Sequence, residues 1–296
     1  MNGFEGFEAR RFAVNGVELA ARVGGAANAP ALLLLHGYPQ MHVMWRRVAQ
    51  QLKSRFQLVM PDLRGYGDSS KPPGTADHSD HSKRAMAQDM AELMSQLGHA
   101  RFGVVGHDRG GRVAHRLALD HAARVDKLCV IDIAPTLDMY AGTDMRFANA
   151  YYHWFFLIQP ASLPERLIGA DAKFYLRTKI DGWGSAGLSI IEPEALAEYE
   201  RCFCKPETIH SSCEDYRASA GIDLEHDRAS REAGQKVLCD MLVLWGERGV
   251  VHRLFKPLSL WQAQCAGRVS GHVMPCGHFV AEELPEQTAQ ELLDFF

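Results

Sequence analysis

The sequence has few of the features that direct a chain to a membrane, an oxidising compartment or a nucleic acid. Its 296 residues contain no apolar run long enough to span a bilayer, and the N-terminal segment MNGFEGFEARRF has no hydrophobic secretory core. The seven cysteines include no CxxC pair, so they indicate neither a disulfide framework nor a zinc site. A net charge of −4 gives no electrostatic basis for binding nucleic acid. These absences predict a cytoplasmic, globular protein with reduced thiols.

Short apolar segments alternate with amphipathic segments along most of the chain. Residues 8–23 surround Asn15-Gly16, a strong hairpin signal, and predict two opening strands. Strands of the buried, apolar kind are predicted at 31–35, 56–60, 101–105, 127–133, 241–245 and 269–274, and helices at 44–52, 82–97, 111–121, 253–265 and the C-terminus. Strands that alternate with helices predict an α/β protein with a mostly parallel central sheet and helices on both faces.

The alternation stops at Pro135 and resumes at Met241. The segment between them is rich in aromatic residues, Met and Arg, and it predicts helices without strands. We therefore expect an α/β core formed by residues 1–135 and 240–296, with a helical cap formed by residues 136–239. Ligands of such sheets bind beyond the carboxyl ends of the strands, so a cap inserted at that edge would cover the site.

The segment Gly106-His107-Asp108-Arg109-Gly110 joins a buried strand to a helix. It matches the nucleophile elbow G-x-S-x-G, a sharp strand-to-helix turn, with aspartate in place of serine. A carboxylate that displaces a leaving group from saturated carbon forms an ester, which water can hydrolyse, whereas serine would form a stable ether. Asp108 therefore predicts substitution at the carbon of an alkyl halide or an epoxide. The alternative is an ordinary aspartate that caps the helix in a glycine-rich turn.

Arg109 and Arg112 fall in the first turn of the helix that follows Asp108. The helix dipole disfavours cations there by typically ~0.3–1 kcal/mol, so a purely surface role runs against local physics. A substrate carboxylate about 4 Å from Asp108 would be repelled by roughly 4 kcal/mol at an effective dielectric near 20. Two guanidiniums would offset that repulsion, so Arg109 and Arg112 predict a substrate that carries a carboxylate.

Four segments, HGYP, DLRGYGDS, GHDRGG and a C-terminal GHF, resemble the α/β-hydrolase superfamily with a cap domain. The order nucleophile, acid, histidine is also the order of that fold. GHDRGGR, YYHWFFLIQP at 151–160 and CEDYRA at 213–218 resemble the bacterial haloacetate dehalogenases, including those that cleave fluoroacetate, along almost the whole chain. Epoxide hydrolases and haloalkane dehalogenases share the elbow but usually have tryptophan after the nucleophile. The resemblance implies an α/β-hydrolase fold, a homodimer, and a reaction that needs no metal or organic cofactor.

The resemblance also implies how the leaving halide is bound. His153, Trp154 and Tyr216 match the halide-binding set of the family, and each offers an N–H or O–H donor. Such donors stabilise charge that develops on the halide in the transition state. Without the resemblance, the aromatic segment at 151–156 would be interpreted as a helix that packs on the core.

The second step needs a base, an acid that orients it, and an oxyanion hole. His278, in Gly277-His278-Phe279 after a late strand, is the predicted base, although His36 and His107 also follow strands. The family places the acid at Asp132, and Glu247 in the segment WGER is its rival because some capped relatives place the acid there. The backbone N–H groups of Tyr38 and Arg109 are expected to hold the oxyanion.

These residues lead to one main hypothesis and two alternatives. The main hypothesis is hydrolytic dehalogenation of haloacetates to glycolate through an aspartyl ester on Asp108. An epoxide hydrolase would use the same aspartate together with two cap tyrosines, Tyr216 and either Tyr151 or Tyr152. A non-catalytic ligand sensor on the same fold is the third possibility. The sequence leaves open the preferred halogen and the length of the haloacid.

Overall fold

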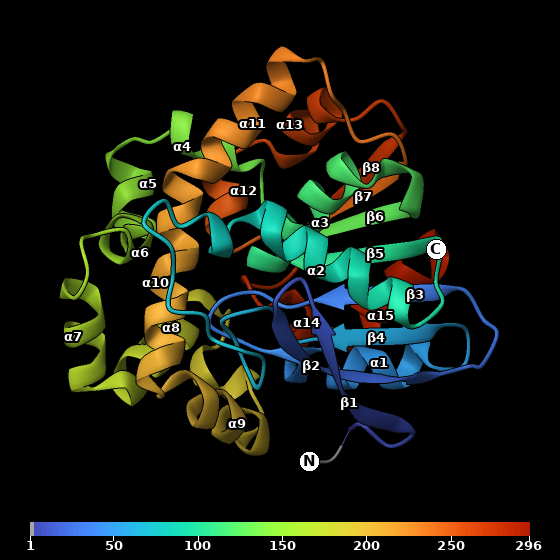
Figure 1. Ribbon diagram of the computed structural model, residues 1–296, viewed down its shortest axis with the longest axis horizontal. Helices are drawn as coiled ribbons and strands as arrows, with labels where there is room; N and C mark the ends of the chain where they lie inside the picture. Colours follow the sequence, from blue (N-terminus) through green and yellow to red (C-terminus); the bar gives the residue numbers. More distant parts are fainter. Residues whose placement is uncertain (1–2) are drawn as a thin grey trace.

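The centre of the protein is an eight-stranded β-sheet, which a computed structural model describes within residues 3–296 (Figure 1). The strands are β1 (Phe7–Val14), β2 (Val17–Gly25), β3 (Ala31–Leu35), β4 (Gln57–Pro61), β5 (Phe102–His107), β6 (Val125–Ile131), β7 (Asp240–Gly246) and β8 (Val269–Met274). Their order across the sheet is β1-β2-β4-β3-β5-β6-β7-β8. β2 runs antiparallel to both of its neighbours, and all other neighbouring strands are parallel. The mostly parallel sheet predicted from the sequence is confirmed. The predicted core starts at residue 1, and residues 1 and 2 lie outside the described residues.

The strands follow from their local sequence. Every residue of β3 and β5 is buried, because central parallel strands are covered by helices on both faces. The predicted hairpin is present: Val14 pairs with Val17, and Asn15 and Gly16 both have positive φ, as the tight turn of a two-residue hairpin requires.

Helices cover both faces of the sheet, with α2 and α3 in front of it in Figure 1 and α1 and α15 behind it. The helices outside the segment between β6 and β7 are α1 (Arg46–Leu52), α2 (Lys83–Gln96), α3 (Arg109–Asp120), α12 (Val250–Leu254), α13 (Pro257–Gln264), α14 (Val280–Glu283) and α15 (Pro285–Phe295), with the short 3₁₀ turns η1 (His42–Trp45), η2 (Ser79–His81) and η3 (Ala122–Arg124). α2 begins after Ser82, whose side chain accepts a hydrogen bond from the N–H of Ala85.

Two predicted helices differ from the structure. The helix after the elbow was expected from residue 111, and it begins at Arg109, directly after Asp108. The single helix expected at 253–265 is two helices, α12 and α13, separated at Phe255 and Lys256. Pro257 explains the break, because proline disfavours helical backbone in the residue before it.

The segment between β6 and β7 is helical, and the described residues include no strand there. It contains α4 (Thr136–Ala141), α5 (Met145–Ala150), α6 (Tyr152–Leu157), α7 (Leu163–Ala170), α8 (Ala172–Trp183), η4 (Gly187–Ile190), α9 (Pro193–Phe203), α10 (Pro206–Ala220) and α11 (Ile222–Glu232). We call these helices the insertion. Figure 1 shows the insertion beyond the ends of the sheet to which the arrows of β3 and β4 point. Within the described residues, no helix is both long enough and apolar enough to span a lipid bilayer.

Candidate active site

Asp108 occupies the turn between β5 and α3. Its φ is 44° and its ψ is −113°, a conformation that costs a non-glycine residue on the order of 1–3 kcal/mol and is found mostly at functional sites. The flanking glycines make the turn possible. A Cβ atom on Gly106 would lie 2.4 Å from the carbonyl oxygen of Gly110, and one on Gly110 would lie 2.4 Å from that of His36. The elbow is therefore a strained turn whose close backbone contacts only glycine can make.

The carboxylate of Asp108 is almost completely buried and is held by the backbone of the loop after β3. The N–H of Tyr38 donates a hydrogen bond of 3.1 Å to its Oδ2 atom. Within residues 3–296, the N–H of Arg109 makes no such bond to Asp108. Burial raises the pKa of Asp108, but the charges of His278 and Arg112 outweigh burial and hold the pKa below its usual value. Asp108 is therefore ionised at neutral pH.

His278 lies beside Asp132 at the carboxyl edge of the sheet. Nδ1 of His278 is 2.5 Å from Oδ2 of Asp132, and Oδ1 of Asp132 accepts a bond of 3.0 Å from the N–H of Gly246. The backbone N–H of His278 donates to the carbonyl of Trp183 in the insertion at 2.9 Å. Burial lowers the pKa of His278, but the hydrogen bond and charge of Asp132 and the charge of Asp108 raise it above its usual value. Glu247, the rival acid, is exposed and makes no side-chain hydrogen bond within the described chain.

The two other histidines considered as bases bind backbone groups. Nε2 of His36 accepts from the N–H of Leu63 at 3.0 Å, and its Nδ1 is 3.0 Å from the carbonyl oxygen of Gly37. Nε2 of His107 is 2.9 Å from the carbonyl oxygen of His278, and burial lowers the pKa of His107 to about 3. His36 therefore holds the loop after β4, and His107 holds the backbone of His278.

Arg112 is a buried cation that has no carboxylate partner among residues 3–296. Its Nη1 atom donates to Oγ1 of Thr136 at 2.9 Å and to the carbonyl of Ala134 at 3.3 Å, and its Nη2 lies 3.3 Å from the sulfur of Met139. Its Nε is buried without a partner, and the guanidinium lies 4.7 Å from the ring centroid of Trp154. A charge that is buried without an ion partner is costly, so this site favours an anion.

Arg109 is also buried, but it is paired. Its Nη2 atom lies 2.7 Å from Oδ1 of Asp215 in α10, and the guanidinium lies 4.2 Å from the ring centroid of Tyr216. Nη1 of Arg109 is buried and has no partner within the part of the chain that the structure describes. The ion pair with Asp215 was not predicted. Asp215 lies in CEDYRA beside Tyr216, but nothing in the local pattern indicated which cation it binds.

The three predicted halide ligands come together in the insertion, on α6 and α10. The ring of His153 is 5.5 Å from that of Tyr216, and the ring of Trp154 is 6.4 Å from it. All three residues are buried, and Nδ1 of His153 and the hydroxyl of Tyr216 have no hydrogen-bond partner among the described residues. Burial, with the nearby charge of Lys179, places the pKa of His153 well below its usual value, so the imidazole is neutral. These three residues therefore leave polar atoms without hydrogen bonds in a buried site beside the guanidiniums of Arg109 and Arg112.

A small hollow of about 20 Å³ lies beside His278. It is lined by Tyr151, Gly182, Trp183, Arg248, Gly249, Val250, Arg253 and His278. Arg248 and Arg253 are exposed.

A larger hollow of about 580 Å³, lined by residues of α2 and α11 among others, contains none of the predicted site residues. Within residues 3–296, no three His, Cys, Asp or Glu side chains are grouped to hold a metal ion.

The sheet, the strained elbow and the order Asp108, Asp132, His278 define the class of the protein. Residues 30–185 match the family model of the alpha/beta hydrolase fold, and the chain belongs to this family.

Within this family, the chain is similar to several individual proteins. The chain is 47% identical over 292 residues to a fluoroacetate dehalogenase of Burkholderia sp, covering 99% of this chain and 94% of that protein. It is 36% identical over 270 residues to a soluble epoxide hydrolase of Corynebacterium sp. (strain C12), covering 90% and 89%. A crystal structure from Nostoc sp PCC 7120, provisionally classed as an α/β hydrolase, superimposes with a TM-score of 0.95 and 53% identity, covering 99% of this chain and 98% of that one.

Proposed function

We propose that this protein is a haloacetate dehalogenase that hydrolyses the carbon–halogen bond of short 2-haloacids through an ester on Asp108. The observation that carries the proposal is that the ionised, buried carboxylate of Asp108 feels the charge of the buried guanidinium of Arg112, which has no carboxylate within ion-pair distance in the described chain. A carboxylate nucleophile can approach an anionic substrate only where cations offset the repulsion between them. The 47% identity to a fluoroacetate dehalogenase supports the same substrate class.

In the first step, the substrate carboxylate binds Arg109 and Arg112. One oxygen of Asp108 attacks the α-carbon from the side opposite the halogen, forming a C–O bond while the halide leaves with the bonding electrons. His153, Trp154 and Tyr216 face the departing halide as hydrogen-bond donors. Because Nδ1 of His153 and the hydroxyl of Tyr216 have no partner in the described chain, a donor at these positions can turn to the halide without breaking an existing bond.

In the second step, water hydrolyses the ester at the carboxyl carbon of Asp108. His278 takes the proton of the water, and Asp132 stabilises the resulting imidazolium. The Oδ2 atom of Asp108, which already accepts from the N–H of Tyr38, becomes the oxyanion. Glycolate leaves and Asp108 is regenerated as a carboxylate, so the net reaction adds water and releases a halide and a proton.

Esterification also prepares His278 for its role. The negative charge of Asp108 is one cause of the raised pKa of His278 in the free enzyme. That charge disappears when Asp108 becomes an ester, so the pKa of His278 falls. The imidazole is then more readily neutral in the one intermediate that needs a base.

Epoxide hydrolysis is the second candidate function, favoured by the similarity to a soluble epoxide hydrolase and by the unpartnered hydroxyl of Tyr216. That chemistry requires a second tyrosine to protonate the epoxide oxygen. Tyr152 is 48% exposed, whereas Tyr151 is buried and its ring lies 5.1 Å from that of His153. Tyr151 is thus the available second tyrosine.

The decisive experiment is a single turnover in ¹⁸O-labelled water with chloroacetate, followed by mass spectrometry of the protein and the product. The ester route places the first label in Asp108, while the first glycolate carries an unlabelled oxygen from the enzyme. Label that passes directly from water into glycolate would overturn the ester route. Release of halide from fluoroacetate, chloroacetate and 2-chloropropionate, compared with turnover of styrene oxide, distinguishes the two candidate functions.

Three further features belong to the proposal. Residues 136–239 act as a cap, because the helices of this segment carry Trp154 and Tyr216 against the arginines of α3. The protein is a cytoplasmic homodimer. Light scattering of the purified protein measures its mass, and a monomer would contradict that assembly.

A further inference from the structure

Arg109 is held in one orientation by acceptors on a single helix. Its Nε and Nη2 atoms donate to the two carboxylate oxygens of Asp215 at 2.9 and 2.7 Å. Nη2 also donates to the backbone carbonyl of Asp215 at 3.0 Å and to Oγ of Ser219 at 2.6 Å. Because these bonds occupy Nε and Nη2, Nη1 is the nitrogen left for a ligand, and it is buried without a partner in the described chain.

Asp215 lies in the insertion, and its carboxylate binds several groups that lie outside the insertion. Besides Arg109, its carboxylate accepts from the hydroxyl of Tyr66 at 2.6 Å and from Nζ of Lys83. Lys83 begins α2, and its backbone N–H donates to Asp223 of α11 at 2.8 Å. One fully buried carboxylate of the insertion thus binds three groups that lie outside the insertion.

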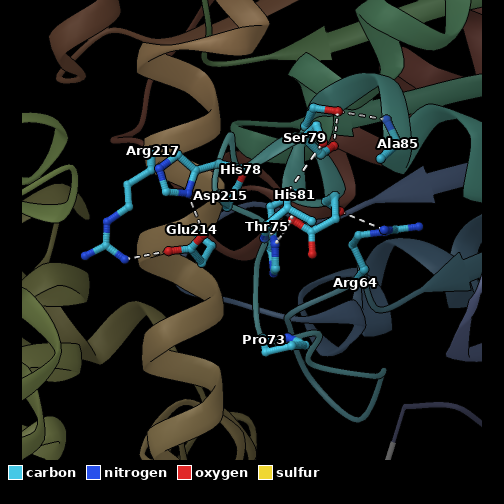
Figure 2. A network of polar contacts seen from close by, with 12 residues as sticks. Arg64, Pro73, Thr75, His78, Ser79, His81, Ala85, Glu214, Asp215 and Arg217 are labelled. Carbon is cyan, nitrogen blue, oxygen red and sulfur yellow. Dashed lines mark hydrogen bonds and ion pairs between the residues drawn. The ribbon is translucent and has the colours of Figure 1, made fainter. Parts of the chain in front are cut away.

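Glu214, the residue before Asp215, links α10 to the loop before α2. Figure 2 shows Glu214 on α10 beside His78 of this loop, and Oε2 of Glu214 lies 2.6 Å from Nδ1 of His78. Glu214 in turn accepts from Arg217 at 2.7 Å. The position of α10, and with it that of Asp215, is therefore fixed by contacts separate from Arg109.

The charges around Asp215 are balanced. Burial raises the pKa of Asp215, but the charges of Arg109 and Lys83 outweigh it and hold the pKa well below its usual value. Burial raises the pKa of Asp223 and lowers that of Lys83. The charge of Arg109 is therefore already compensated by Asp215, whereas that of Arg112 is not compensated by any carboxylate within ion-pair distance in residues 3–296.

We propose that Asp215 is a positioning residue for substrate binding: it fixes the guanidinium of Arg109 so that Nη1 alone donates to the substrate carboxylate. The inference rests on the proposed function and deepens it. Arg112 supplies the net positive charge, and Arg109 supplies a directed hydrogen bond. A guanidinium that is already ordered loses little freedom when the ligand arrives, so the carboxylate binds to a pre-formed site. Because Asp215 lies on α10, the seating of the insertion and the orientation of Arg109 are coupled.

The test compares Asp215→Asn in the wild-type protein and in an Arg109→Met background. KM and kcat for chloroacetate are measured by halide release. We expect Asp215→Asn to raise KM on the order of 10- to 100-fold, with a smaller change in kcat, because losing a well-directed hydrogen bond between a guanidinium and a carboxylate weakens binding by about that factor. In the Arg109→Met background the same substitution should leave KM unchanged. An equal rise in KM in both backgrounds would overturn the proposal, because Asp215 would then not act through Arg109.

Ser219→Ala gives a milder version of the test in case Asp215→Asn does not fold. It keeps every charge and removes one acceptor of Arg109. We expect KM to rise by roughly two- to tenfold in the wild-type background and not at all with Arg109→Met. An unchanged KM in the wild-type background would contradict the proposal.

Asp89→Asn is the matched control. Asp89 is another fully buried carboxylate that binds an arginine through both oxygens, in this case Arg64, and it lies outside the candidate site. We expect it to lower thermal stability without raising KM. If Asp215→Asn behaved in the same way, its role would be structural only.

Calorimetric binding of acetate separates this proposal from the proposed function. Acetate carries the carboxylate without a halogen, so its binding does not depend on turnover. Wild-type protein that binds acetate in an Asp215-dependent manner but releases no halide would overturn the dehalogenase and keep the positioning role. If the wild-type protein releases halide but Asp215→Asn leaves acetate binding unchanged, the proposed dehalogenase activity stands and the positioning role of Asp215 is overturned.

Discussion

The two halves of the candidate site satisfy their polar groups differently. At the strand ends, Asp108 accepts from the N–H of Tyr38, and Asp132 accepts from the N–H of Gly246 while it binds His278. In the insertion, Nδ1 of His153 and the hydroxyl of Tyr216 are buried with no partner in the described chain. A buried polar group without a hydrogen bond costs roughly 1–3 kcal/mol.

This difference suits the two halves of the site to different tasks: the strand ends to the chemical steps, and the insertion to binding the leaving group. The strand ends hold the proposed nucleophile, Asp108, and the proposed base, His278, by hydrogen bonds that are already made before any ligand binds, at the cost of positive φ at Asp108 and Asp132. The insertion keeps donors unused, so a ligand that accepts from them relieves a cost that the free protein bears. A halide formed during the reaction is such a ligand, because its charge develops as the carbon–halogen bond breaks.

The largest expected loss of activity follows from a substitution at the strand ends. Asp108→Ala removes the nucleophile, and we expect kcat for halide release to fall by at least ~10⁴-fold, as for other residues that act as one catalytic unit. The measurement is halide release from chloroacetate, with circular dichroism as the control for folding. Dehalogenation that survives this substitution would contradict the central role of the elbow.

Arg112→Gln removes the cation that has no carboxylate partner in the described chain. We expect kcat/KM for chloroacetate to fall by roughly 10²- to 10³-fold, because about 4 kcal/mol of repulsion is no longer fully offset. Arg116→Gln on the same helix is the matched control: Arg116 is buried but bound to Asp227, and its loss should lower stability with little effect on KM. Equal kinetic effects of the two substitutions would argue against a carboxylate site.

Tyr216→Phe tests the insertion half directly. We expect kcat for fluoroacetate to fall by about 10²-fold, as on loss of one donor to a developing anion, and kcat for bromoacetate to fall less. Because this hydroxyl has no partner in the described chain, thermal stability should not fall. Tyr199→Phe, which removes a bond to Glu282, should show the opposite pattern of lower stability and unchanged kcat. A joint loss of stability and activity in Tyr216→Phe would contradict an open donor.

The pH dependence separates the two steps at the strand ends. The pKa of Asp108 is lowered, so esterification continues in mild acid. Hydrolysis of the ester needs neutral His278, whose pKa in the ester lies below its raised value in the free enzyme because the charge of Asp108 is gone. Steady-state turnover should therefore fall about tenfold per pH unit below the pKa that His278 has in the ester, while the first turnover of halide release persists as a burst. Rapid-quench measurements at several pH values test this, and a burst that disappears together with turnover would contradict it.

The smallest change in kcat/KM is expected from the two arginines that line the hollow beside His278. Arg248 and Arg253 are exposed, so they would attract an anionic substrate only over a screened distance. Replacing both with Gln should lower kcat/KM for chloroacetate by roughly tenfold or less at low salt, leave kcat unchanged and weaken the dependence on salt. An unchanged salt dependence would show that the substrate enters elsewhere.

Several elements could be predicted because their signals are local. The run Ala31–Leu35, the Asn15-Gly16 turn and the glycines around Asp108 each lie within a few residues of the structure that they specify. The break between α12 and α13 was missed although Pro257 was visible, because apolar periodicity continues across it. The start of α3 was placed at residue 111 because Gly110 has low helix propensity and the helix dipole disfavours a cation such as Arg109 in the first turn, and the packing of the elbow overrides both preferences.

The α/β alternation, the sharp turn at Asp108 and the carboxylate in that turn could be inferred from the amino-acid sequence, because periodicity, turn residues and side-chain chemistry are properties of neighbouring residues. The three-dimensional packing was needed to establish that Asp132, 146 positions from His278, binds it while Glu247 faces solvent. It was also needed to show that Asp215 compensates Arg109 and that Arg112 has no carboxylate partner among the described residues. Such pairings depend on how separate helices and strands pack, and no local pattern records which buried charge will meet which.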